Sequence, residues 1–237
     1  MNPETPLRLR YGKPSRVAPT ERETVPVDLV GREVDDRRFY RACKRTFDLT
    51  IGGAILILVG PLVPLVAILI RLDSAGPVFY RQDRVGKGNR PFKFYKFRSM
   101  YVEAERRQGE LEGSNEQDGP VFKMRVDPRV TPVGRFLRRS SMDEIPQVLN
   151  VLRGDMSIVG PRPPLPAEVA RYSPSHRRRL DVKPGITCLW QISGRSQIGF
   201  DEWMRLDMEY LRTRSLRTDF LIFVKTIPAV MARRGAY

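Results

Sequence analysis

Two adjacent carboxylates, Asp143 and Glu144, are the side chains of this sequence best suited to carry out a reaction. Pro146 lacks an N–H group and is tolerated in the first turn of a helix but not deeper, so we expect a helix to begin near Met142 or Asp143. Both carboxylates would then lie at the positive end of that helix, where the helix dipole keeps them ionised and where a phosphate also binds. An ionised aspartate beside a bound phosphoryl group is a candidate nucleophile that forms an aspartyl-phosphate.

The same residues also allow a purely structural interpretation. Ser141 and Glu144 fit the S-x-x-E capping box, which closes the first turn of a helix, and short motifs of this kind often occur without a function. Arginines on both sides of the carboxylates favour anion chemistry instead. They are Arg135, Arg138 and Arg139 before the pair and Arg162 after it.

The chain is strongly basic. Its 237 residues, enough for one catalytic domain with appendages, include 42 Lys and Arg against 27 Asp and Glu, a net charge of +15. This charge predicts an acidic partner, which is a nucleic acid, an anionic lipid or a phosphorylated small molecule. Cys43, Cys188 and the single His176 have no metal-ligand spacing, so we expect neither a zinc site nor a disulfide, and no histidine general base.

Residues 49–70 form an uncharged apolar run that predicts a membrane element. As one straight helix the run would extend about 33 Å, enough for a hydrocarbon core of roughly 30 Å. Pro61 and Pro64 fall near its middle, and each removes a helical hydrogen bond. Basic residues flank both ends, and the positive-inside rule assigns both flanks to the cytoplasm. We therefore favour a re-entrant helix, broken at the prolines, over a kinked single span.

The remaining sequence predicts an α+β fold, a mainly helical catalytic domain with a small β element and interfacial amphipathic helices. Residues 76–100 are typical of two strands joined by a turn, with Lys96 and Arg98 on one face. A charged helix is expected over residues 101–113, a core-packed helix over 200–211 and an amphipathic helix over 219–234. The expected divisions are a flexible N-terminal extension (1–38), an interfacial segment with the re-entrant membrane helix (39–72) and a cytosolic catalytic domain (73–237).

Asp207 and Glu209 superficially match the D-x-D metal motif of nucleotide-sugar glycosyltransferases. Residues two apart on a helix point in different directions, so we expect no metal site there.

Six sequence blocks in a fixed order make the chain from Arg41 to about Ile227 resemble the bacterial sugar transferase family, the monotopic phosphoglycosyl transferases. The blocks are KRTFD (44–48), Pro61 with Pro64, PFKFYKFRSM (91–100), SMDEIPQ (141–147), GDMSIVGPRP (154–163), and KPGIT (183–187) continuing to WQISGR (190–195). Any one block is a weak signal, whereas all six in family order are specific.

This resemblance implies a two-step transfer of a sugar 1-phosphate from a UDP-sugar to undecaprenyl phosphate, the initiating step of exopolysaccharide, capsule or O-antigen synthesis. Asp143 would attack the β-phosphate, release UMP and carry the sugar phosphate until the lipid accepts it. Glu144 would bind Mg²⁺ or help to activate the acceptor. Basic positions in the matching blocks are the expected substrate contacts, because arginine binds phosphate through two parallel donors. They are Lys96, Arg98, Arg138, Arg162 and Arg195.

The resemblance also implies a place at the cytoplasmic face of the bacterial inner membrane, among anionic lipids, with no nucleic acid as partner and a homodimer left open. The Leu189-Trp190-Gln191 variant resembles members that transfer hexose 1-phosphates, such as those of glucose or galactose. Cys188 stands where the family usually has glycine, which questions a tight backbone conformation there. Compared with the larger members of the family, we expect residues 1–38 to stand in place of a multi-helix N-terminal region.

Two other functions compete with this one. A metal-dependent glycosyltransferase would move a bare sugar and release UDP. A non-enzymatic protein that binds a membrane surface or nucleic acid would need only the positive charge, and its binding would depend strongly on salt.

Overall fold

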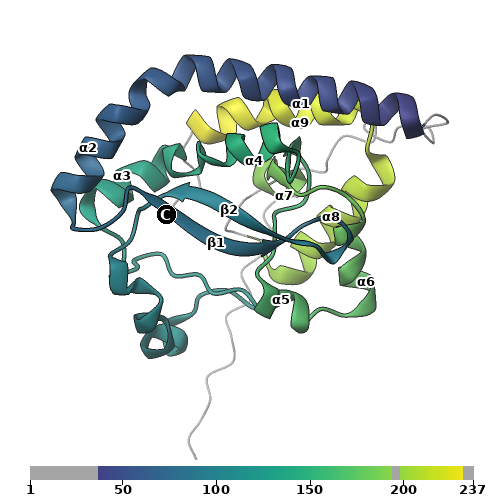
Figure 1. Cartoon of the computed structure of the whole chain (residues 1–237). Helices are drawn as coiled ribbons and strands as arrows, with labels where there is room; N and C mark the ends of the chain where they lie inside the picture. Colours follow the sequence, from purple (N-terminus) through teal and green to yellow (C-terminus); the bar gives the residue numbers. More distant parts are fainter. Residues whose placement is uncertain (1–36, 194–197, 232–237) are drawn as a thin grey trace, which may run out of the picture.

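The computed structural model describes residues 37–193 and 198–231 (Figure 1). In this part of the chain, helices surround two small two-stranded sheets, which confirms the predicted mainly helical α+β fold. All but the end of the predicted N-terminal extension (1–38) lies outside the described residues.

The apolar run lies within a long helical element. Helix α1 (Arg37–Val59) is joined to α2 (Val63–Asp73) by a 3-10 turn, η2 (Gly60–Leu62). The helical stretch Arg38–Asp73 is long and apolar enough to cross a membrane. Its 18-residue apolar window has a mean hydropathy of 2.7, and only 11% of this window is buried. Figure 1 shows α2 leaving the end of α1 at an angle. Because Pro61 and Pro64 cannot donate helical hydrogen bonds, the change of direction falls at this point; the re-entrant path through a bilayer stays a prediction.

The predicted strand pair is confirmed as an antiparallel hairpin of β1 (Phe79–Val85) and β2 (Pro91–Phe97). Tyr80 lies opposite Lys96 and Arg84 lies opposite Phe92. Since side chains two apart share a face, Lys96 and Arg84 project from the same face of the hairpin. The outer edge of β2 is closed by the Asn150 side chain, whose Nδ2 donates to Lys93 O (2.7 Å) and whose Oδ1 accepts from Tyr95 N (3.2 Å).

A second sheet, not predicted from the sequence, pairs β3 (Ser157–Val159) with β4 (Gly185–Thr187) in parallel. The two chains approach closely beside Gly160 and Gly185. A Cβ atom built on Gly160 would lie 2.4 Å from Lys183 O, and one on Gly185 would lie 2.1 Å from Gly160 N. Glycine is therefore required at both positions.

Shorter helices connect these sheets. Residues 101–113, predicted as one charged helix, instead form 3-10 turns, η4 (Val102–Ala104) and η5 (Arg106–Ser114), because Gly109 and Gly113 interrupt a segment with no apolar stripe to pack. The others before α8 are α3 (Pro132–Arg139), η6 (Met142–Glu144), α4 (Gln147–Arg153), α5 (Pro166–Ala170), α6 (Pro174–Arg177), η7 (Arg178–Asp181) and α7 (Leu189–Ile192).

Two C-terminal helices complete the core. Helix α8 (Phe200–Thr213) confirms the predicted core helix and buries Leu206, while α9 (Leu216–Met231) buries Ile222 in the same cluster as β3. Helix α9 lies along α1 (Figure 1), where the Phe47 and Phe223 rings are 5.9 Å apart. Its other side exposes Phe220, so α9 is amphipathic, as expected for residues 219–234.

Buried polar contacts fix α1 to α4, α9 and β3. Lys44 Nζ lies 3.0 Å from Asp219 Oδ2 on α9. Asp48 Oδ1 accepts hydrogen bonds from Ser157 Oγ (2.8 Å) and Ile158 N (2.9 Å) on β3. The guanidinium of Arg45 donates to the carbonyls of Val151 (2.6 Å) and Leu152 (2.7 Å) on α4. The long apolar helix and the rest of the described chain are thus tied together by directional contacts as well as by apolar packing.

Candidate active site

Asp143 and Glu144 lie on the single 3-10 turn η6, not on the first turn of an α-helix as predicted. Helix α4 begins only at Gln147, after Pro146. Ser141 adopts φ 56°, a left-handed conformation that is rare outside glycine, and its side chain makes no capping hydrogen bond. The capping-box interpretation is therefore wrong, since the turn is shaped by its backbone and packing.

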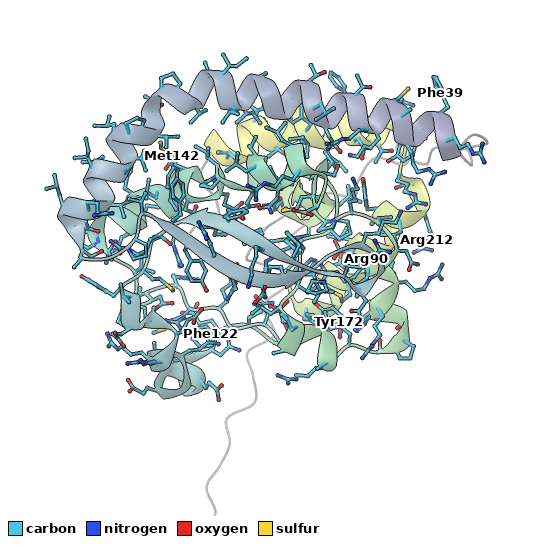
Figure 2. All side chains as sticks on the ribbon, viewed as in Figure 1. Phe39, Arg90, Phe122, Met142, Tyr172 and Arg212 are labelled. Carbon is cyan, nitrogen blue, oxygen red and sulfur yellow. The ribbon has the colours of Figure 1, made fainter. Side chains whose placement is uncertain are left out.

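Met142 anchors this turn beneath α2. Its side chain packs against a cluster that contains Val66 and Ile70 of α2, Phe97 of β2 and Leu137 of α3. Figure 2 places Met142 below the bend between α1 and α2. The two carboxylates that follow Met142 are therefore held close to the apolar helix.

A single lysine from β2 bridges both carboxylates. Lys96 Nζ lies 2.8 Å from Glu144 Oε1 and 3.3 Å from Asp143 Oδ2. The Asp143 side chain is almost buried, with 7% of its surface exposed, whereas 30% of the Glu144 side chain is exposed. The contact shows that Lys96 faces the acidic pair.

The surroundings shift the pKa values of Asp143 and Glu144 in opposite directions. Burial raises the pKa of Asp143, and the neighbouring Glu144 raises it further, against the pull of Lys96 and Arg138. Burial also acts to raise the pKa of Glu144, but Lys96 with Arg162 outweighs it and the net effect lowers that pKa. Asp143 is consequently the more basic and shielded carboxylate, and Glu144 the more firmly ionised one.

Three arginines from separate segments surround the pair. They are Arg138, Arg162 and Arg84. Arg138 on α3 donates from Nε to Ser99 Oγ (3.0 Å); burial lowers its pKa, and the negative charge of Asp143 opposes that effect. Arg162 lies with its guanidinium 5.4 Å from the Trp203 ring centroid and 3.5 Å from Glu168. It is also among the groups that lower the pKa of Glu144.

Arg84 is the member of this set that the sequence did not single out. It is 8% exposed and donates from Nη1 to Pro163 O (3.0 Å). Burial, with Arg162 beside it, lowers its pKa to about 9, while Glu144 acts in the opposite direction, so Arg84 stays cationic at neutral pH. The signal was available in the two-residue period of β1, which puts Arg84 on the face that carries Lys96.

Arg98, another predicted substrate contact, does not join the group. Arg98 is 6% exposed and donates to the carbonyls of Ala75 (3.0 Å), Ser74 (2.6 Å) and Ile70 (3.3 Å), so its guanidinium closes the end of α2. This placement indicates a structural role, and substrate binding by Arg98 stays untested. Arg195 lies outside the described residues.

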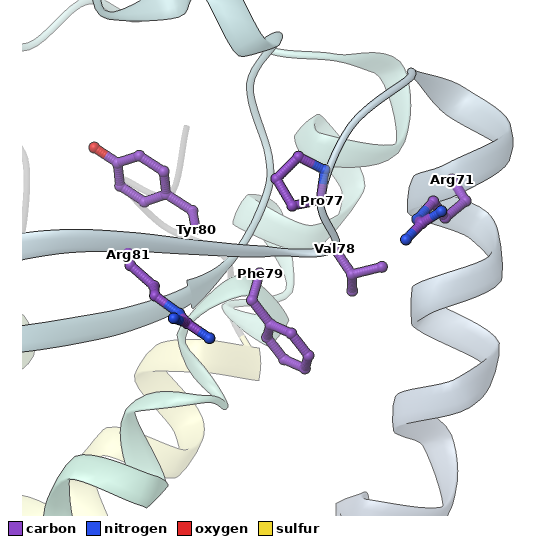
Figure 3. A pocket seen from close by; sticks show the side chains of 6 residues that line it. All are labelled: Arg71, Pro77, Val78, Phe79, Tyr80 and Arg81. Atoms are coloured by element: carbon purple, nitrogen blue, oxygen red, sulfur yellow. The ribbon is translucent and has the colours of Figure 1, made fainter.

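A surface groove of about 610 Å³ opens beside the start of β1. Figure 3 shows Arg71 of α2 at one wall, Phe79 and Arg81 on one side of the strand, and Tyr80 pointing to the opposite side. Tyr80 is the residue paired with Lys96. The groove therefore adjoins the carboxylate site without containing the carboxylates.

A magnesium ion bound at the carboxylate pair would need further ligands from a substrate. No group of three or more His, Cys, Asp or Glu residues suited to a metal occurs within residues 37–193 and 198–231. Mg²⁺ commonly binds one or two carboxylates together with substrate phosphate oxygens, which is the donor set that Glu144 and Asp143 offer. Asp207 pairs with buried Arg179 and Glu209 with surface Arg205, and the absence of a metal site at these two residues stays a prediction.

Cys188, the departure from the family pattern, occupies an ordinary extended backbone with φ −158° and ψ 173°. It is 2% exposed. This conformation is open to any residue, so glycine is not required there.

Comparisons with known proteins identify the family that this chain resembles. A model of the family described as "Bacterial sugar transferase" matches residues 39–233. The chain is 45% identical over 204 residues to the galactosyl transferase CpsE of Streptococcus agalactiae, 42% over 198 residues to the exopolysaccharide production protein ExoY of Sinorhizobium fredii, and 41% over 208 residues to an undecaprenyl-phosphate galactose phosphotransferase of Salmonella typhimurium.

These alignments cover most of this chain but unequal shares of the relatives. They include 84%, 82% and 85% of the chain, respectively, and 45% of CpsE, 88% of ExoY and 43% of the Salmonella protein. The chain thus spans less than half of two of these relatives and most of the third.

Proposed function

The chain belongs to the bacterial sugar transferase family, and on that basis we propose that it transfers a hexose 1-phosphate from a UDP-sugar to undecaprenyl phosphate and releases UMP. The observation that carries this proposal is the buried carboxylate of Asp143, which shares Lys96 with Glu144 among arginines from three segments. Two relatives are named for galactose, which makes UDP-galactose the first donor to test.

In the first step an oxygen of Asp143 attacks the phosphorus that bears the sugar. The bond from this phosphorus to the bridging oxygen breaks, and UMP leaves with the bridging oxygen and its electron pair. The sugar phosphate then remains on Asp143 as an acyl phosphate. In the second step a phosphate oxygen of undecaprenyl phosphate attacks the same phosphorus and the Asp143 carboxylate leaves, which restores the enzyme.

The geometry gives the two carboxylates different tasks. Asp143 is shielded and its pKa is raised by burial, so it is the better nucleophile once ionised. Lys96, Arg84 and Arg162 neutralise the diphosphate, since positioning and charge stabilisation carry most of a phosphoryl transfer. Glu144, the more exposed and more firmly ionised carboxylate, would hold Mg²⁺, which when bound neutralises the charge that develops on the leaving phosphate.

The membrane element would deliver the lipid acceptor to this pocket. The long helix exposes Ile57 and Leu58, each about 80% accessible, as a lipid-facing surface would. With basic residues at both of its ends, a re-entrant path would leave both flanks in the cytoplasm. We therefore place the domain at the cytoplasmic face of the bacterial inner membrane, where Met142 holds the reactive turn beneath α2.

The covalent step can be tested without the acceptor. The purified chain in lipid nanodiscs would be given UDP-galactose, UDP-glucose or UDP-N-acetylglucosamine with Mg²⁺, and the intact protein would be weighed by mass spectrometry. One donor should add the mass of one sugar phosphate, with about one UMP per protein, and Asp143→Asn should abolish both. Release of UDP, or undiminished turnover by the Asn variant, would instead indicate the bare-sugar glycosyltransferase.

A further inference from the structure

Glu168, a buried glutamate on α5, has no task in the mechanism above. Its side chain is 3% exposed, and glutamate is rarely buried in this way without a partner for its charge. One carboxylate oxygen, Oε2, accepts a hydrogen bond from Leu165 N (3.0 Å) and so closes the first turn of α5. The other oxygen, Oε1, faces Arg162, and the helix does not require this contact.

The side chain of Arg162 is held from two sides. Its Nη1 atom donates to Glu168 Oε1 at 3.5 Å, and its guanidinium carbon lies 5.4 Å from the centroid of the Trp203 ring. The backbone of the same residue is fixed as well, because its carbonyl accepts from Arg179 Nη2 at 3.0 Å. Since 31% of the Arg162 side chain is exposed against 3% of the Glu168 side chain, a ligand can reach the guanidinium but not the carboxylate.

Arg162 shares its surroundings with a second cation, Arg84. Burial and the charge of Arg162 lower the pKa of Arg84, and the negative charge of Glu168 opposes them. Arg84 is tied to the segment before α5, because its Nη1 donates to Pro163 O (3.0 Å). An arginine without a counter-ion would turn away from this like charge, and ordering it again on binding would cost side-chain entropy. A carboxylate beside the two cations offsets their repulsion.

We propose that Glu168 is a positioning residue, a buried carboxylate that holds the guanidinium of Arg162 on the Trp203 ring in the orientation that binds the diphosphate of the donor. The ion pair uses an N–H group on one edge of the guanidinium, and the outer N–H groups meet the phosphate oxygens. Glu168 acts through Arg162 and touches no substrate. This inference rests on the proposed function, since it takes Arg162 as a contact of the UDP-sugar.

Glu168→Gln separates this task from the closing of α5. Glutamine also closes a first helical turn from this position, through an amide oxygen that accepts from Leu165 N. Its amide nitrogen then faces Arg162, where a donor meets a donor and the ion pair is lost. We expect KM for the UDP-sugar, and Kd for UDP as an unreactive diphosphate, to rise about fivefold. The value of kcat should stay within about twofold and the melting temperature within about 4 °C of the wild type. An unchanged KM and Kd, or a rise that comes with a larger fall in the melting temperature, would overturn the inference.

Two comparisons show whether Glu168 acts through Arg162. In an Arg162→Met background, adding Glu168→Gln should raise Kd for UDP by less than about twofold, because the side chain that Glu168 holds is gone; a fivefold rise there would contradict the proposal. Glu103→Gln is the matched control, since it removes the same charge from an exposed pair with Arg106 (3.1 Å) and should change neither KM nor Kd. A similar rise in this control would also count against the proposal.

A measurement on the wild type does not depend on the folding of Glu168→Gln. The chain in nanodiscs, labelled with ¹⁵N at its arginine side chains, would be observed by NMR before and after UDP is added. One guanidinium, assigned by its absence from Arg162→Lys, should rotate slowly already without UDP, since the ion pair and the Trp203 ring hold it. Free rotation of this group before UDP is added would reject the inference. UMP release and the Asp143 adduct in the wild type would still decide the proposed function separately.

Discussion

Replacing Asp207 by asparagine should destabilise the protein far more than replacing Glu209, on the same helix, by glutamine. Asp207 Oδ2 lies 2.6 Å from Arg179 Nη2, and the two side chains are 1% and 0% exposed. Burial acts to lower the pKa of Arg179, but the negative charge of Asp207 outweighs burial, so the net effect raises that pKa. Asparagine would leave this guanidinium buried without a counter-ion, a change that costs about 3–5 kcal/mol. For a chain of this size the melting temperature should fall by ~6–20 °C.

Glu209 on the same helix provides the matched control. It pairs with Arg205 at 3.0 Å, but the side chains are 28% and 55% exposed, so Glu209→Gln should cost less than about 1 kcal/mol. Thermal unfolding in detergent, followed by the fluorescence of Trp190 and Trp203, measures both variants. Adding Arg179→Met to Asp207→Asn should recover part of the lost stability, because no unpaired charge remains. If Asp207→Asn cost no more than Glu209→Gln, or if the double variant were less stable than Asp207→Asn, the reasoning would be wrong.

Three further predictions concern the site and its supports. Arg98→Met should lower the melting temperature by several degrees, because Arg98 donates hydrogen bonds to the carbonyl groups at the C-terminal end of α2. In a steady-state assay the same variant should leave KM for the UDP-sugar unchanged. A rise in KM without a loss of stability would support substrate binding instead. Arg162→Lys should raise KM for the donor about tenfold, because lysine cannot lie flat on Trp203 and bind phosphate bidentately, whereas exposed Arg171→Lys should be neutral in the same assay. Because the folded-state pKa of Asp143 is raised, ionising this carboxyl group costs stability as the pH rises through that pKa. Thermal unfolding at pH 7 should therefore find Asp143→Asn at least as stable as the wild type, and a less stable Asn variant would contradict the assigned direction. For the same reason the acid limb of the wild-type pH–rate profile should fall above pH 3.8.

Local periodicity predicted the elements whose pattern is long or regular. The uncharged run around Pro61, the hairpin that carries Lys96 and the core helix that begins at Phe200 were all placed correctly. Each of these buries a face, or is uniformly apolar, over many residues, so the sequence pattern and the tertiary structure agree. The sequence marked Lys96 as a candidate substrate contact, and the structure adds its contact with the carboxylates.

Features decided by a single residue or by distant packing were missed. Alternation assigned Lys96 and Arg98 to one face, but β2 ends at Phe97, so Arg98 leaves the strand and turns to α2. The left-handed backbone of Ser141 moved the carboxylates to an isolated 3-10 turn, although the same residues fit a capping box. The pairing of β3 with β4 joins segments far apart in sequence, and three-residue strands give no periodic signal.

The bond of Arg45 to the last carbonyls of α4 has a consequence for how the enzyme would respond to its lipid surroundings. Helix α4 starts beside the acidic turn and ends against α1, so in the proposed membrane-bound state it would act as a strut of fixed length between the carboxylates and the bilayer surface. Thinner or thicker bilayers would tilt α1 and carry the carboxylates with it. Turnover should therefore vary with acyl-chain length in reconstituted vesicles, and cutting the strut with Arg45→Met should weaken that dependence.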